Sequence, residues 1–316
     1  HILPNTDGRG YGLLVPDSNS LHWLLEHWQE IENETTRQAV LMMMHENYQA
    51  KNIPDTAWIN ALLNGIHREK NPLTASTLTN YLSAPLQEIS QEERDKVENE
   101  LYALSHSHPI PSCRIQLLRL LIAEATSPAL LQHLYTLWET QNSRQLNERD
   151  YTALAYELSL RMSGQGTRIL EIQRQRINNP DRLRQFDFIS RAMTADTLKL
   201  DSLFQSLLQA ENRRIEPWAA TTLSYLNHSA RKDYAVKYIR PALEELVEVQ
   251  RTGDIFFPRN WVGALLRNHS SEAAYREVET FLSTHPDYPP LLKNKILQAA
   301  YPLYCLLYTS PSPRDA

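Results

Sequence analysis

Hydrophobic residues recur along most of the chain with the spacing of an α-helix. Val40, Met43, Met44 and Tyr48 fall at positions i, i+3, i+4 and i+8, which lie on one face of a helix. Three further sets share this spacing: Leu130, Leu134, Leu137 and Trp138; Tyr151, Leu154, Ala155, Leu158 and Met162; and Ala274, Val278, Phe281 and Leu282. Each set predicts an amphipathic helix with its apolar face against a core.

Helix-start signals precede several of these patterns. Ser127-Pro128 offers a capping serine and a proline at the first helical position. Asp181 follows Pro180, and Ser271 stands before the pattern that ends at Leu282. These signals predict helices that begin close to residues 128, 181 and 271.

The fold class follows from the number of such segments. We expect roughly a dozen or more helices joined by short loops rich in proline, asparagine and serine. The stretch 115–122 is apolar on nearly all sides, which predicts a helix buried on several faces. No fixed repeat period appears, and the tetratricopeptide signature is absent. The sequence therefore predicts a mainly α protein built as an irregular HEAT- or armadillo-like curved helical array.

The first sixteen residues have a different character. Gly8, Gly10 and Gly12 are three of the eight glycines, and Asp7-Gly8 lies between two short apolar runs. An Asp-Gly turn between apolar runs predicts a β-hairpin. Two strands alone are marginal in water, so we expect this hairpin to be the end of a larger sheet.

The last twelve residues, 305–316, resemble a translated sequencing-library adapter. We therefore expect the helical domain to run over 17–304 and Cys305 to lie outside the natural protein. Cys113 would then be a lone thiol, which leaves the redox compartment open.

Composition excludes some classes of function. Hydrophobic residues make up 42% and charged residues 22%, and the formal net charge is −5. A nucleic-acid binder would show a basic excess, so no nucleic-acid partner is expected. No run of 18 apolar residues occurs, which predicts no membrane segment.

Motifs for catalysis are missing. A zinc protease needs two histidines at i and i+4 with a glutamate after the first, but in His45-Glu46-Asn47-Tyr48-Gln49 a glutamine takes the second place. His106, His108 and Cys113 fit no standard metal spacing, and the segment 163–166 is interpreted as a helix stop. The sequence predicts no catalytic residue and no metal site in this chain.

Several segments resemble one family of enzymes. The blocks are Leu3 to Gly12, Arg37, Arg176 to Arg182, Glu211 to Trp218, Gln250 to Trp261, His285 to Pro290 and Lys295 to Ala300. In this order they are similar to the end of the β-sandwich and the C-terminal helical domain of zinc aminopeptidases of the aminopeptidase-N type. The similarity is to a bacterial branch of that family. The resemblance covers residues 2–304, and its strongest block is Gln250 to Trp261.

The resemblance implies a parent enzyme that releases N-terminal amino acids from peptides. The β-domain, the zinc domain and most of a β-sandwich would precede His1, so residues 1–16 would end that sandwich and this chain alone would be inactive. The helical domain would cover the active site and contact peptide substrates. The resemblance suggests that Arg213, Arg214 and Arg259 contact the C-terminal side of a peptide substrate, because guanidinium groups bind carboxylates bidentately. Trp218 and Trp261 are interpreted as core anchors.

Two alternatives remain at this point. The chain could be a stand-alone helical-repeat scaffold for a protein partner, or part of a catalytically dead relative. The predicted hairpin in residues 1–16 favours the interpretation as part of an aminopeptidase, because a stand-alone scaffold has little use for an open sheet edge. The compartment, either the bacterial cell envelope or the cytoplasm, stays open.

Overall fold

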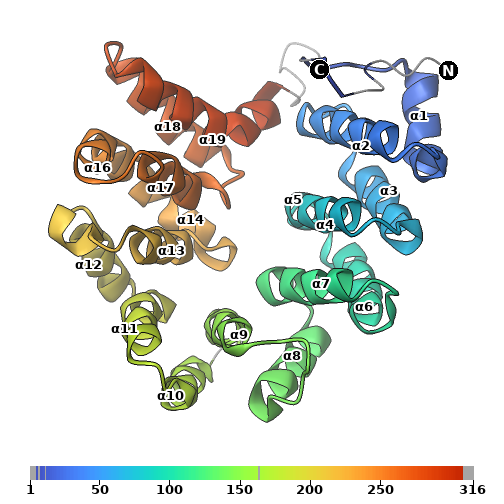
Figure 1. Cartoon of the computed structure of the whole chain (residues 1–316). Coiled ribbons are helices and arrows are strands. Elements are labelled where there is room, and N and C mark those ends of the chain that lie inside the picture. Colours follow the sequence, from blue (N-terminus) through green and yellow to red (C-terminus); the bar gives the residue numbers. More distant parts are fainter. Residues whose placement is uncertain (1–4, 6–7, 11, 163, 309–316) are drawn as a thin grey trace. The chain divides into compact units, whose positions relative to one another are not determined.

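The computed structural model describes residues 5, 8–10, 12–162 and 164–308, and all regular elements within these residues are helices (Figure 1). The predicted mainly α class is confirmed. The chain forms two compact units, His1–Glu157 and Leu158–Ala316. The sequence predicted one helical domain over 17–304, and its boundaries at residues 16 and 304 stay predictions.

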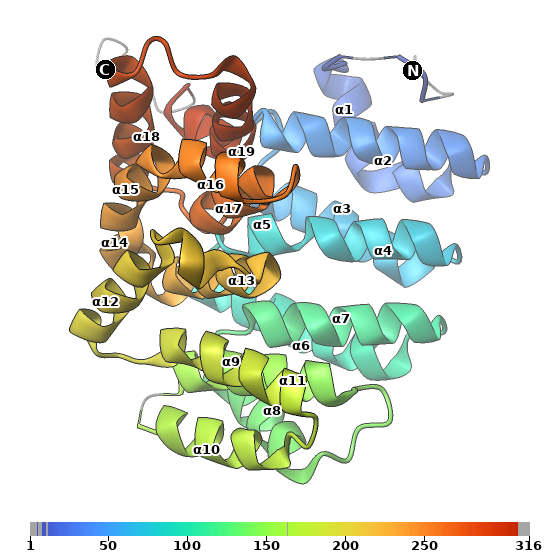
Figure 2. The ribbon, with the colours of Figure 1, turned by 60° about the vertical axis from the view of Figure 1, so that its left-hand side comes forward.

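The first unit holds nine α-helices and one 3₁₀ turn that begin before residue 157 among the described residues. They are α1 (Ser18–His27), η1 (Trp28–Glu30), α2 (Glu34–Gln49), α3 (Asp55–Arg68), α4 (Pro72–Tyr81), α5 (Ser83–Leu86), α6 (Gln91–Ser107), α7 (Pro111–Glu124), α8 (Pro128–Thr140) and α9 (Glu148–Arg161), which continues past the unit boundary. Helix α1 packs on α3, α3 on α4, α4 on α7 and α6 on α7 (Figure 2).

The helix starts follow the capping signals in the sequence. The Ser127 side chain accepts a hydrogen bond from the Leu130 N–H, and Pro128 occupies the first turn of α8. Leu130, Leu134 and Trp138 are buried, as their spacing predicts, while Leu137 of the same predicted face is only half-buried.

The core of the first unit depends on a close approach between η1 and α3. Trp28 is fully buried, and its indole N–H donates to the Ala61 carbonyl at 3.2 Å. A Cβ at Gly65 would lie 2.3 Å from Trp28 Cζ2, so only glycine fits there. In α7 the buried side chains include Leu117, Leu118, Leu120, Leu121 and Ile122, which confirms a helix buried on several sides.

The second unit contains shorter elements. They are α10 (Gly166–Arg176), α11 (Pro180–Ile189), η2 (Ser190–Met193), α12 (Thr197–Leu207), η3 (Ala210–Arg213), α13 (Glu216–Leu226), η4 (Ser229–Arg231), α14 (Lys232–Ala235), η5 (Val236–Tyr238), α15 (Ile239–Glu244), α16 (Leu246–Thr252), α17 (Phe257–Leu266), α18 (Glu272–Thr284) and α19 (Pro290–Tyr308). Helix α11 packs on α13, α13 on α17, and α17 and α18 on α19 (Figure 1).

Helices α13 and α17 run parallel to each other. At their starts the Asp254 N–H donates to Glu216 Oε1 at 2.8 Å. Beyond their ends His269 Nε2 lies 2.9 Å from Asn227 Oδ1. Because both pairs of ends match, the two helices begin on the same side of the unit.

Most predicted helix signals in and near this unit hold, with one correction. All of Ala274, Val278, Phe281 and Leu282 are buried in α18, which Ser271 caps. Helix α11 begins at Pro180, close to the expected start, and the Asn179 side chain caps it by accepting from the N–H groups of Asp181 and Arg182. The correction concerns Met162, which lies just beyond the end of α9.

The predicted hairpin lies partly outside the described residues, at 1–4, 6–7 and 11, and its strands stay a prediction. Within the described part the Gly8 N–H donates to the Asn5 carbonyl at 3.0 Å, and Gly8 has a φ of +69°. The Asn47 side chain donates to the Leu14 carbonyl at 2.8 Å, which ties this segment to α2. Of the suspected adapter tail, 309–316 lie outside the described residues.

Candidate peptide-contact surface

The three arginines suggested by the resemblance lie in two different environments of the second unit. Arg213 ends η3 and is 3% exposed. Arg214 follows it directly and is exposed, and Arg259 is exposed in the first turn of α17. Only Arg214 and Arg259 are therefore open to a ligand from solvent.

Arg213 makes its hydrogen bonds and its ion pair inside the unit. Its Nη1 donates to the carbonyls of Leu207 and Leu208, at 3.0 and 2.7 Å, at the end of α12. The same nitrogen donates to Glu245 Oε1 at 3.0 Å. A cation at the carbonyl end of a helix satisfies orphan acceptors and the helix dipole, so Arg213 closes α12.

The rest of the Arg213 guanidinium rests against an aromatic ring. Its Cζ lies 5.7 Å from the ring centroid of Trp261, a distance suited to a cation–π contact. Its Nε and Nη2 are buried and find no hydrogen-bond partner among the described residues. This packing joins η3 to α17 and places Arg214 at the surface.

Trp261 and Trp218 differ in burial. Trp261 is fully buried, and its indole N–H donates to the Ala242 carbonyl at 3.0 Å, as expected for a core anchor. Trp218 is half-buried, with its ring centroid 5.9 Å from that of Phe188.

Two loops meet beside Arg214 and Arg259. The Glu216 carboxylate, at the start of α13, holds the Asp254 N–H of the second loop. Asp254 Oδ1 in turn accepts from the N–H groups of Phe256 and Phe257, at 2.7 and 2.8 Å. These bonds fix the backbone of the segment that enters α17.

This fixed backbone presents apolar side chains to solvent. Ile255 is 81% exposed, Phe256 is 68% exposed and Ile215 is 46% exposed. We call Arg214, Ile215, Ile255, Phe256 and Arg259 the loop surface. Exposed apolar groups beside two cations suit a ligand with an apolar side chain and a negative charge.

Gly253 sets the shape of this loop, and its replacement by alanine tests the shape. A Cβ there would lie 2.6 Å from Phe257 Cδ1 and 2.9 Å from both Glu216 Oε1 and the Val249 carbonyl. We expect Gly253→Ala to lower the unfolding free energy by about 1–3 kcal/mol through overpacking. Urea denaturation measures this, with Gly263→Ala as control, because outside its own stretch of helix no atom of the described residues lies within 4 Å of a Cβ at Gly263. Equal stability of the two variants would contradict the close packing.

The histidines considered as metal ligands have other contacts. His45 Nε2 lies 2.9 Å from Gln49 Nε2, and its ring stacks on Tyr81 with centroids 3.6 Å apart. His108 Nε2 contacts the Ile66 carbonyl at 2.9 Å. Burial raises the pKa of the Cys113 thiol to about 11. Within the described residues no three His, Cys, Asp or Glu side chains are grouped as they would be to hold a metal ion.

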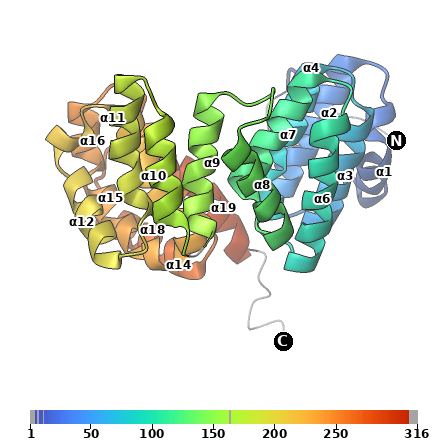
Figure 3. The same ribbon diagram turned by 90° about the horizontal axis from the view of Figure 1, so that it is seen from below.

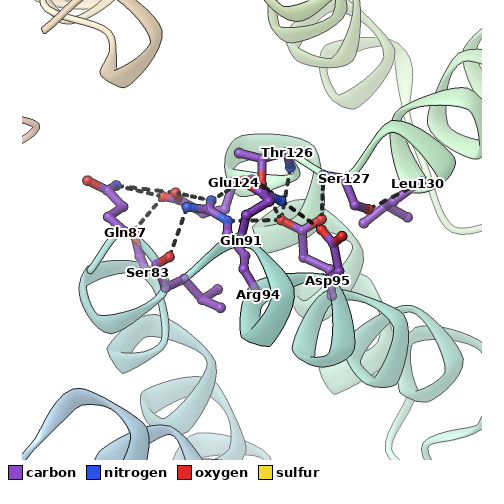
Figure 4. A network of polar contacts seen from close by, with 11 residues as sticks. Ser83, Gln87, Gln91, Arg94, Asp95, Glu124, Thr126, Ser127 and Leu130 are labelled. Atoms are coloured by element: carbon purple, nitrogen blue, oxygen red, sulfur yellow. Dashed lines mark hydrogen bonds and ion pairs between the residues drawn. The ribbon is translucent and has the colours of Figure 1, made fainter. Parts of the chain in front are cut away.

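Sequence reasoning missed a buried ionic network in the first unit, which can be followed in Figure 4. Arg94 Nε donates to Glu98 Oε1 at 3.0 Å, and Arg94 Nη1 donates to the Leu86 carbonyl at 2.8 Å. Arg94 Nη2 also donates to the Glu124 carbonyl. The Arg-x-x-x-Glu spacing was a signal, but the same spacing is common on exposed helix faces.

Glu98 also links α6 to the start of α8. Its carboxylate accepts from the N–H groups of Thr126 and Ser127, both at 2.9 Å. Ser83 Oγ donates to Glu124 Oε1 at 2.5 Å on the other side of the network. The network therefore fixes four consecutive helices and is structural.

No protein-family model matches the chain, and no curated protein matches it. In the described part of the chain, no helix combines the length and hydropathy needed to cross a membrane.

Proposed function

We propose that the chain is the helical substrate-access part of a zinc aminopeptidase of the aminopeptidase-N type, with the zinc held by residues outside this sequence. Its role is to contact peptides beyond their first residues and to limit which peptides reach the active site. The sequence resemblance supports the family. The loop surface is the observation in the structure that carries the role.

We further propose a HEAT- or armadillo-like arrangement of the helices. The support is a recurring separation between bonded partners: Arg37 bonds Glu69 across 32 positions, Ser83 bonds Glu124 across 41, and Asp254 bonds Glu216 across 38. A layered array produces such contacts, since each helical pair touches the next one. The parallel run of α13 and α17 is what equivalent helices of successive layers would show.

The loop surface has the chemistry for a peptide's C-terminal part. Ile255 and Phe256 offer apolar contact area, while Arg214 and Arg259 offer guanidinium donors for a carboxylate. Arg213 supports this surface from the interior instead of touching a ligand, because it is buried and bonded to backbone carbonyls.

The genomic DNA upstream of codon 1 tests the family directly. We expect a reading frame that continues upstream and encodes a His-Glu-x-x-His motif with a further glutamate about two dozen residues on. A start codon directly before Ile2 would contradict the proposal and favour a stand-alone scaffold.

The purified chain is expected to show no zinc-dependent hydrolysis of aminoacyl substrates. The expectation rests on the sequence, which has no two histidines at i and i+4 of the kind that hold a zinc-activated water. The measurement is release of a chromophore from aminoacyl anilides with and without added zinc. Turnover that a chelator abolishes would contradict the prediction.

The parent enzyme carrying Arg259→Ala tests the role of the loop surface. We expect kcat/KM to fall about tenfold for peptides long enough to reach the surface, and to stay unchanged for a dipeptide, because one charged hydrogen bond is lost. Arg267→Ala is the control, since Arg267 is exposed at the other end of α17. Equal kinetics for all lengths would exclude Arg259 from substrate contact.

A further inference from the structure

A pocket of about 480 Å³ lies among α10, α11, η2 and α12, inside the second unit. Figure 3 labels the three α-helices that contribute to it. Its lining includes three buried apolar side chains, Phe186, Met193 and Leu203. Ser190 and Ser202 add hydroxyl groups. The volume falls within the range of small-molecule sites, which is about 300–1,000 Å³.

Two of the three cations that line the pocket are already paired. Arg174 makes a bidentate pair with Asp187, at 2.7 and 2.9 Å. Lys199 Nζ lies 3.7 Å from Asp196 Oδ2. The first pair joins α10 to α11, and the second lies at the start of α12. Because each cation is neutralised by its partner, neither adds net charge for a ligand.

The remaining charged lining residues are one anion and one cation. Glu171 on α10 and Arg191 on η2 are both exposed at this pocket. Within the described residues neither side chain makes a hydrogen bond or an ion pair. The pocket therefore offers one free carboxylate and one free guanidinium around an apolar floor.

We propose that this pocket binds a small zwitterion with an apolar side chain, namely a free amino acid or a short peptide with both ends unblocked. Glu171 takes the α-ammonium group, Arg191 takes the carboxylate, and the side chain lies against Phe186, Met193 and Leu203. A simple inorganic anion would leave the Glu171 carboxylate and the apolar floor unused. This site is separate from the loop surface, and the inference does not depend on the proposed function.

Isothermal titration calorimetry of the whole chain with free leucine, leucyl-leucine, N-acetyl-leucine and leucinamide tests the proposal. We expect the zwitterions to bind, and each blocked leucine to bind about tenfold to a hundredfold more weakly, because each loses one charged hydrogen bond. Glu171→Gln should abolish the penalty for N-acetylation and keep the penalty for amidation. Arg191→Gln should do the reverse.

Controls separate the pocket from general surface charge. Glu211→Gln and Arg267→Gln change exposed residues of the same unit that do not line the pocket, so binding should be unchanged. Ser202→Trp places a bulky ring in the pocket and should abolish binding, while circular dichroism confirms that the variant is folded. No binding of leucine or leucyl-leucine at 10 mM, a concentration about tenfold above a 1 mM dissociation constant, would overturn the proposal. Equal binding of blocked and unblocked leucine would overturn it as well.

Discussion

Glu98→Leu is expected to lower the unfolding free energy of the first unit by about 3–5 kcal/mol. The carboxylate is fully buried and accepts from Arg94 Nε and from the N–H groups of Thr126 and Ser127. Without it the Arg94 charge loses its closest buried partner, and two backbone donors at the start of α8 lose their acceptor. Removal of one partner of a buried ion pair costs more than the pair contributes, because the other charge stays desolvated.

Urea denaturation of Glu98→Leu measures this loss, and the same helix offers a matched control. Glu92 forms an ion pair with Lys96 at the same i, i+4 spacing, but the two side chains are 83% and 70% exposed. Glu92→Gln should therefore change stability far less than Glu98→Leu does, because solvent screens the exposed pair. If the two variants lose similar stability, burial is not what makes the Arg94–Glu98 pair important.

Acidification is expected to destabilise both units through one histidine in each, half-buried His45 and buried His269. Burial lowers the pKa of His45 to about 4 in the first unit, and burial, with Lys232 nearby, lowers the pKa of His269 to about 4 in the second. An unfolded histidine has a pKa near 6.5, so the unfolded chain takes up the proton first. The stabilisation is complete above pH 6.5 and is lost as the pH falls from 6.5 to 4, by about 2.5 kcal/mol for each histidine at pH 4.5.

Urea denaturation between pH 7 and pH 4.5 checks this prediction. His45→Phe keeps an aromatic ring against Tyr81 and removes the titrating group, so the first unit should lose about 2.5 kcal/mol less over this range than it does in the unmodified chain. His67→Phe is the control, because His67 is 47% exposed and pairs with Glu100 at the surface. The same pH slope in His45→Phe and in the unmodified chain would show that His45 does not titrate in this way.

Much of the helical fold could be predicted because the deciding interactions are local in the sequence. Ser127 and Ser271 cap the helices that follow them, and the spacing in 274–282 names the buried face of α18. Local rules could not predict the short elements between Ser229 and Thr252, where 3₁₀ and α turns alternate. In this segment packing against neighbouring helices determines the backbone conformation, since each short helix is too short to be stable by itself.

The candidate sites were less predictable, because burial depends on distant segments. Arg94–Glu98 and Lys96–Glu92 have the same spacing, and only the turn at 125–127 and the Leu86 carbonyl make the first pair an interior one. Arg213 and Arg214 are adjacent, yet the end of α12 takes one into the interior and leaves the other exposed. The pocket at Glu171 and Arg191 left no sequence signal, since its lining comes from four separate elements.

The recurring separation between bonded partners has a consequence for how the chain acquires its structure. His108 reaches Ile66 across 42 positions, and Tyr288 reaches Leu243 across 45, so these distant links still join near neighbours in a chain of 316 residues. In the helical array proposed above, contacts between near neighbours would predominate, which favours rapid folding from several starting points. Damage at one helical pair would then weaken its neighbours first, so the proposed array predicts hydrogen-exchange protection that changes stepwise along the chain instead of in one cooperative block.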